Sequence, residues 1–180
     1  MNAMNTHYPD ATRIEAPARH TLAVIVDNEP GVLARIAGLF SGRGYNIESL
    51  TVSETEHEKH LSRITIVTTG TAAVIEQIKA QLGRLVPIHR VTDLTVQGQA
   101  IERELVLCKV AGKGEQRVEA MRLASAFGAR TLDATLQSFV FELTGSTEEV
   151  ERFIGLMTAV GLVEVSRTGI AAMSRGAEGM

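Results

Sequence analysis

Residues 27–51 read DNEPGVLARIAGLFSGRGYNIESLT, and this stretch predicts a polar loop, a helix, a glycine-rich exit and the start of a strand. Asp27 and Asn28 are of the residue types that cap helix N-termini, and Pro30 fits the first helical turn. We therefore expect the helix to begin near residues 29–31 and to end at Gly42 and Gly44. Its apolar residues have the spacing of a stripe that faces a core: Val32, Leu33, Ile36, Leu39 and Phe40.

The same stretch has the features of a binding site for a small zwitterion. The free N–H groups at a helix start attract a carboxylate, and Gly31 adds no bulk there. The side-chain amides of Asn28 and Asn46 can both donate and accept hydrogen bonds. The residues expected to bind such a ligand, three of them as walls of a small aliphatic pocket, are Asn28, Gly31, Val32, Leu33, Asn46 and Ile47. The alternative interpretation is a capped helix followed by a glycine turn, with no ligand.

Hydrophobic periodicity along the chain predicts the same order of elements twice. In the first half we expect strands at 20–26, 46–54, 61–69 and 86–96, with a second helix between Thr71 and Gly83. In the second half we expect strands at 101–110, 130–135, 138–144 and 162–170, and helices at 115–127 and after the capping box that Ser146 begins. The sequence therefore predicts an α+β fold of two tandem ferredoxin-like βαββαβ units.

The expected domain organisation follows from these patterns. Residues 1–19 lack apolar periodicity and a signal-peptide core, and are expected to form a disordered tail. Residues 20–97 form the first unit, and residues 98–180, which begin in a polar linker, form the second. Only the first unit contains the loop from Asn28 to Gly31, so a ligand is expected there.

Composition excludes several classes of protein. The 180 residues include 21 acidic and 18 basic side chains, a formal charge of −3, and aromatics make up only 4% with no tryptophan, which does not favour a nucleic-acid partner. No apolar run approaches the roughly 20 residues of a membrane span. The single cysteine, Cys108, lies in an apolar run, which indicates a buried structural thiol and a reducing, cytoplasmic location.

No catalytic or metal-binding constellation is evident. Gly112 and Gly114 superficially resemble a phosphate loop, but the first glycine and the final Ser or Thr of that motif are missing. His57 and His60 lie in a polar hairpin loop and are expected to be solvated. The remaining candidates, His20 and His89, are expected at the edge or surface of strands without a positioned carboxylate.

Six short segments carry a more specific signal: NEPGVL at 28–33, LFSGRGYNIESLT at 39–51, LSRITI at 61–66, IEREL at 101–105, SRTG at 166–169 and SRG at 174–176. Together they resemble the small, regulatory subunit of acetohydroxyacid synthase (acetolactate synthase), whose first domain is an ACT domain. The resemblance covers residues 21–176.

The resemblance implies a non-catalytic subunit that activates the large catalytic subunit and confers feedback inhibition by valine or another branched-chain amino acid. It also implies a homodimer through the ACT domain, in which the Asn28 loop of one chain faces Asn46 and Ile47 of the other. Thiamine diphosphate, Mg²⁺ and FAD are expected on the large subunit, and no cofactor or metal is expected in this chain. The C-terminal residues Arg167, Ser174, Arg175 and Gly176 are then a contact or regulatory element.

Two other interpretations remain open from the residues alone. The first is a free-standing ACT-domain sensor of amino acids that regulates another enzyme or transcription. The second is a small enzyme on a ferredoxin-like frame, which requires a catalytic cluster that the sequence does not show.

Overall fold

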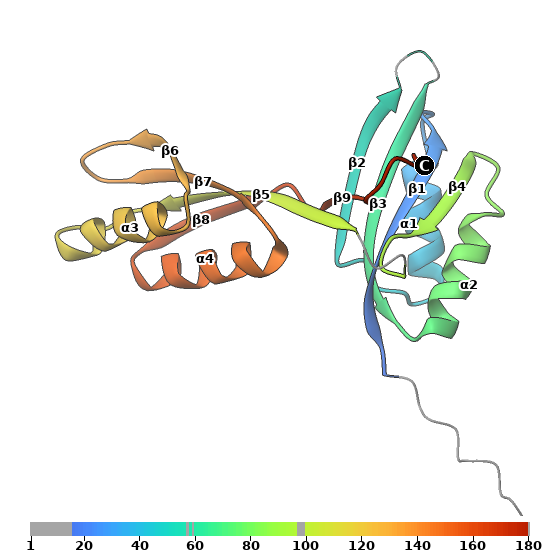
Figure 1. Ribbon diagram of the computed structural model, residues 1–180, viewed down its shortest axis with the longest axis horizontal. Coiled ribbons are helices and arrows are strands. Elements are labelled where there is room, and N and C mark those ends of the chain that lie inside the picture. The colour runs from blue at the N-terminus through green and yellow to red at the C-terminus, as the bar shows by residue number, and fades with distance from the viewer. Residues whose placement is uncertain (1–15, 57, 59, 97–99, 180) are drawn as a thin grey trace, which may run out of the picture.

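The computed structural model describes residues 16–56, 58, 60–96 and 100–179 and contains two α+β units (Figure 1). The first unit has the order β1 (Ala18–Asp27), α1 (Val32–Gly42), β2 (Ser49–Glu56), β3 (Leu61–Gly70), α2 (Ala72–Leu82) and β4 (Ile88–Asp93). Its strands form an antiparallel sheet in the order β2-β3-β1-β4. This is the predicted βαββαβ arrangement.

The second unit repeats the arrangement. Its elements are β5 (Ile101–Val110), α3 (Glu115–Ala126), β6 (Arg130–Ala134), β7 (Phe139–Gly145), α4 (Thr147–Ala159) and β8 (Leu162–Arg167). They form a sheet in the order β6-β7-β5-β8, and a short ninth strand, β9 (Ala171–Met173), pairs with the start of β5. The predicted fold of two tandem ferredoxin-like units is therefore confirmed.

Each unit has its own core between its sheet and its two helices. Because successive side chains of a strand point to opposite faces, Leu22, Val24 and Val26 of β1 face the helices of the first unit. In the second unit Val106, Cys108 and Val110 of β5 do the same. Cys108 is fully buried, as predicted, and burial raises the pKa of its thiol to about 11.

Local capping signals predicted two helices correctly. The Thr71 side chain accepts a hydrogen bond from the Val74 N–H at the start of α2. At the start of α4 the Ser146 hydroxyl accepts from the Glu149 N–H at 3.3 Å, and the Glu149 carboxylate accepts from the Ser146 N–H at 2.8 Å. These reciprocal bonds are the predicted capping box.

The predicted start of α1 is wrong. The helix begins at Val32 with Gly31 as its N-cap, no side chain caps it, and Pro30 lies before the cap rather than in the first turn. Asp27 is the last residue of β1. Gly31 has φ +88°, a left-handed conformation that favours glycine. The backbone angle therefore explains why a glycine occupies the N-cap position.

Several other boundaries differ from the expectation. Ala18 and Arg19 belong to β1 and not to the tail, whose residues 1–15 lie outside the described part of the chain. Strand β2 begins at Ser49, three residues later than expected.

Apolar patterning also misplaced three side chains. Leu33 is 43% exposed and therefore not part of the core, and Val86 and Val96 lie outside β4 and are exposed. Local periodicity gives the face of an element but not where the element ends.

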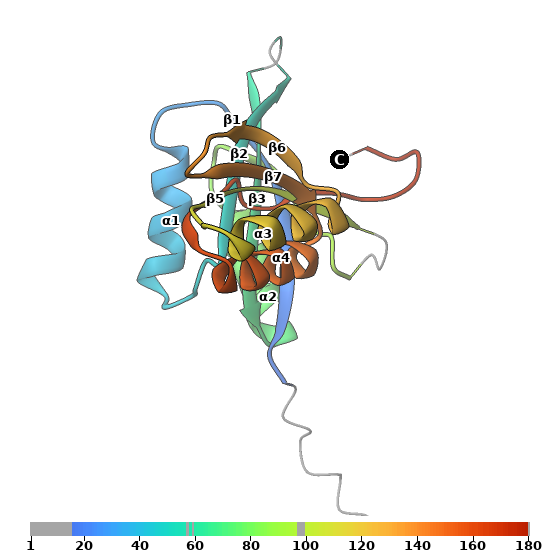
Figure 2. The ribbon, with the colours of Figure 1, turned by 90° about the vertical axis from the view of Figure 1, so that its left-hand side faces the viewer.

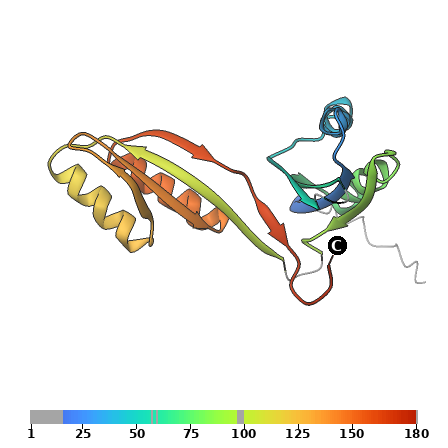
Figure 3. The same ribbon diagram turned by 90° about the horizontal axis from the view of Figure 1, so that it is seen from above.

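The two units are joined by β5 and by the segment that returns beyond β8, as Figure 3 shows. Ile170 and Ala172 of this segment pack against the sheet face of the first unit that the helices leave open, on Ala23, Val67 and Leu94. Arg63 of β3 donates a hydrogen bond to the Ala172 carbonyl at 2.7 Å. The expectation that Ser174, Arg175 and Gly176 form a contact or regulatory element stays a prediction.

Arg167→Met tests how much the ion pair between Arg167 of β8 and Glu104 of β5 stabilises the second unit. Glu104 is only 2% exposed at its side chain and accepts hydrogen bonds from Arg167 at 3.1 and 2.5 Å. Removing the arginine leaves a buried carboxylate without its cation, so we expect a loss of about 3 kcal/mol in the free energy of unfolding. The measurement is urea-induced unfolding, monitored by circular dichroism.

Lys109→Met is the matched control, because Lys109 also lies on a strand and pairs with Glu164, but both side chains are exposed. We expect that change to cost clearly less stability than Arg167→Met, because an exposed ion pair contributes little. Equal losses in the two variants would contradict the role given to burial.

Candidate functional site

The loop between β1 and α1 is exposed, and the N-terminus of α1 lies at the surface. The Asn28 N–H donates to the His60 carbonyl at 2.7 Å, which ties the loop to the turn before β3. The Arg35 N–H donates to the Gly31 carbonyl at 3.0 Å and closes the first helical turn. The N–H groups of Leu33 and Ala34 precede that bond, so they are available to an anion.

The side chains at this helix start divide between surface and core. Asn28, Gly31 and Leu33 are exposed, and Val32 is 4% exposed and packs inside the core of its own unit. The exposed Leu33 side chain fits the expected pocket wall better than a core position. Val32 anchors the helix start to the core of the first unit.

Asn46 and Ile47 follow the other end of α1. The Asn46 side chain is exposed, and its backbone carbonyl accepts a hydrogen bond from the Thr68 hydroxyl at 2.6 Å. Ile47 is half-buried against the first core. Tyr45 holds the turn by an edge-to-face contact with Phe40, with ring centroids 6.0 Å apart.

Figure 2 shows the two loops at opposite ends of α1. The helix has eleven residues, so about 16 Å separates its ends. A single chain therefore does not bring Asn28 and Gly31 together with Asn46 and Ile47. The arrangement in which two chains complete the site stays a prediction.

The expectation for His20 and His89 was wrong in one respect, because each has a carboxylate partner. His20 Nδ1 lies 2.8 Å from Asp93 Oδ2, and His89 Nε2 lies 2.6 Å from Asp27 Oδ1. Both pairs join β1 to β4, which are adjacent only in the folded sheet. The strand order of a ferredoxin-like unit was the signal that could have predicted these pairs. The second pair anchors the beginning of the Asn28 loop.

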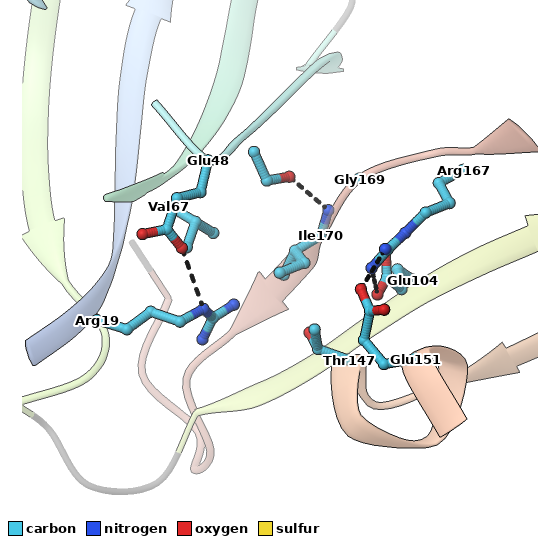
Figure 4. A pocket seen from close by; sticks show the side chains of 10 residues that line it. Arg19, Glu48, Val67, Glu104, Thr147, Glu151, Arg167, Gly169 and Ile170 are labelled. Carbon is cyan, nitrogen blue, oxygen red and sulfur yellow. Dashed lines mark hydrogen bonds and ion pairs between the residues drawn. The ribbon is translucent and has the colours of Figure 1, made fainter. Parts of the chain in front are cut away.

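A cavity of about 350 Å³ lies between the two units (Figure 4). It is lined by residues from distant parts of the chain: Arg19, Glu48, Ser49, Val67, Glu104, Thr147, Glu151, Arg167, Gly169 and Ile170. Sequence patterns did not reveal it, because no short segment contributes more than three of these residues.

The charges in this cavity are paired with one another. Arg167 binds Glu104 and Glu151, and the hydrogen bond to Glu104 raises the pKa of the arginine further above its usual range. Arg19 donates to Glu102 at 3.1 Å and lies 3.9 Å from Glu48. The Arg19–Glu102 pair connects the two units electrostatically.

Two further observations concern the described residues. No helix among them is both long and apolar enough to cross a lipid bilayer. In the same part of the chain, no three side chains of His, Cys, Asp or Glu are grouped so that they could hold a metal ion.

Comparison with known families matches both units. Residues 22–90 match the family model of the AHAS small subunit-like ACT domain, and residues 103–176 match the small subunit of acetolactate synthase. The Asn28 loop and Asn46 both lie within the first match.

Individual relatives agree with these families. A probable acetolactate synthase small subunit of Archaeoglobus fulgidus is 48% identical over 88% of this chain and 98% of its own length. The acetolactate synthase isozyme 3 small subunit of Escherichia coli is 42% identical over 88% and 96%. The crystal structure of the acetolactate synthase small subunit from Thermotoga maritima superposes with a TM-score of 0.81 at 36% identity, over 89% of this chain and 99% of that one. The chain therefore belongs to the family of acetolactate synthase small subunits.

Proposed function

We propose that this chain is the non-catalytic regulatory subunit of acetolactate synthase, that it activates the large catalytic subunit, and that it confers feedback inhibition by valine. The observation that carries the proposal is the 48% identity to an acetolactate synthase small subunit over 88% of this chain. The exposed helix start beside Asn28 supports the part of the proposal that concerns an amino-acid effector.

The proposed effector site lies between the first units of two chains in a homodimer. The valine carboxylate meets the N–H groups around Gly31 to Leu33, where the helix dipole also favours negative charge. The ammonium group meets the side-chain oxygens of Asn28 or Asn46 and backbone carbonyls. The isopropyl group contacts Leu33 and Ile47, with Val32 behind them.

Regulation then follows from linkage between two binding equilibria. Without valine, the dimer binds the catalytic subunit and favours its active arrangement. Valine inhibits only if it binds the less activating state more tightly, typically by about 1 to 3 kcal/mol. The same difference makes the catalytic subunit weaken the binding of valine.

The chemistry is assigned to the partner. The proposed large subunit carries thiamine diphosphate, Mg²⁺ and FAD, and this chain carries no cofactor. The proposed location of the complex is the cytoplasm, which suits a chain whose one cysteine is buried as a free thiol.

The direct test is the rate of acetolactate formation by the large subunit of the same organism. We expect the rate to rise when this chain is added and to fall again when valine is added. Stimulation that valine leaves unchanged would contradict the effector site while keeping the partner. Without stimulation or co-purification, the alternative of a free-standing amino-acid sensor would replace the proposal.

Asn28→Ala tests the polar contacts of the site. The variant should still activate the catalytic subunit, but its binding of valine should weaken by about 1 to 3 kcal/mol, because the ammonium group loses an oxygen partner. The measurement is the valine concentration that gives half-maximal inhibition. Gln116→Ala removes an exposed amide near the start of α3 and serves as a control. Full inhibition of Asn28→Ala at the wild-type valine concentration would exclude this contact.

A pair of variants at Gly31 tests whether the carboxylate lies at the helix start. A Cβ at this position meets no atom within 4 Å, but φ is +88°, so any side chain introduces backbone strain. Gly31→Asn and Gly31→Asp share that strain and nearly the same shape, and differ in one charge. The aspartate should bind valine more weakly than the asparagine by about 1 kcal/mol or more. Equal affinities by calorimetry would remove the helix-terminus model.

A further inference from the structure

The segment that follows β8 leaves its own unit and lies on the other one. The Thr168 N–H donates to the Leu105 carbonyl at 3.1 Å, so this residue still belongs to the second sheet. Two residues later, the Ile170 N–H donates to the hydroxyl of Ser49 at the start of β2, also at 3.1 Å (Figure 4). The chain therefore contacts both units here, and β9 beyond it packs on the first sheet while it pairs with the start of β5.

Gly169 is required by the closeness of this crossing. Its φ is +80°, and a Cβ there would lie 2.8 Å from Thr51 Oγ1 and 2.9 Å from Ser49 Oγ. Both distances are shorter than real Cβ contacts. A side chain at residue 169 must therefore displace these two hydroxyls or move the segment away from β2.

The first unit's side of this contact follows directly on the proposed effector site. Ser49 comes two residues after Ile47, and the intervening Glu48 donates its N–H to the Val67 carbonyl at 2.8 Å. The Glu48 carboxylate also accepts a hydrogen bond from the Thr69 hydroxyl at 2.6 Å. One residue, bonded to β3 through both its backbone and its side chain, therefore connects Ile47 to Ser49.

The second unit's side of the contact is just as direct. Arg167 comes two residues before Gly169 and forms ion pairs with Glu104 of β5 and Glu151 of α4. Only Thr168 separates Gly169 from the arginine whose ion pair joins β8 to α4. The cavity of about 350 Å³ lies beside these residues.

We propose that the contact of Gly169 and Ile170 with Ser49 and Thr51 couples the effector site to the orientation of the second unit. This inference rests on the proposed function, because valine is the ligand whose binding it transmits. Energetic coupling requires packed contacts that both sites bias, and this contact has the effector loop on one side and α4 on the other. Valine at Asn46 and Ile47 shifts Ser49, and the segment at residues 169–173 carries that shift to the second unit.

The test is the ratio of two dissociation constants for valine, one for the chain alone and one for its complex with the catalytic subunit. Linkage makes this ratio equal to the coupling, which is typically about 5- to 150-fold. In Gly169→Ala the ratio should fall to within about twofold of one, while the chain alone still binds valine. Both constants are measured by calorimetry with valine as the titrant.

Gly128→Ala is the matched control, because Gly128 has φ +68° but a Cβ there meets no atom within 4 Å. It shares the backbone strain without the clash, and should keep the wild-type ratio. Ser49→Ala adds no atom and removes the acceptor of the Ile170 N–H. It should lower the ratio even if Gly169→Ala does not fold.

Amide exchange at Ile170 gives a readout that does not need the catalytic subunit. In the wild-type chain, valine should change the exchange rate of this amide. The Ser49→Ala variant should lose that response.

The outcomes separate the coupling from the proposed function. If the Ser49 and Gly169 variants both keep the wild-type ratio, the coupling is overturned while the effector site stands. If the wild-type chain neither binds valine nor stimulates the catalytic subunit, the proposed function is overturned and the coupling with it.

Discussion

The structure depends on how the chain covers the open face of its first sheet. A ferredoxin-like sheet packs its helices on one face and leaves the other exposed, and here that other face carries Ala23 and Val67. Ile170 and Ala172 bury these residues to at most 1% exposure. Because the cover belongs to the second unit, apolar burial in the first unit fixes where the second unit lies. The interdomain cavity and its ion pairs follow from this packing.

Much of the fold was predictable because its signals are local. Thr71 and Ser146 cap helices through bonds that span three residues, and the alternation in β5 gives its buried face directly. The order of elements then leaves few topologies for two βαββαβ units. The chain's membership in its family was likewise evident from short segments that lie mostly in loops and strand starts.

The remaining features depend on contacts between distant residues. Asp27 was predicted to cap α1, but its carboxylate is taken by His89 across the sheet, and Gly31 takes the cap position by its backbone angle. Leu33 matched the periodicity of a core residue but lies on the exposed side of the helix start. Neither β9 nor the contact of Gly169 with Ser49 has a local signal, because a glycine required by a distant hydroxyl looks like any other glycine.

We propose that one effector site takes residues from two chains. Asn28 and Asn46 lie at opposite ends of α1, so the most direct measurement is valine binding to a mixed dimer of an Asn28→Ala chain and an Asn46→Ala chain. Each homodimer of a single variant should bind valine weakly, because both of its sites are damaged. The mixed dimer should recover one site of wild-type affinity per dimer, formed by the intact asparagine of each chain. A mixed dimer that binds no better than either parent would contradict a site shared between chains.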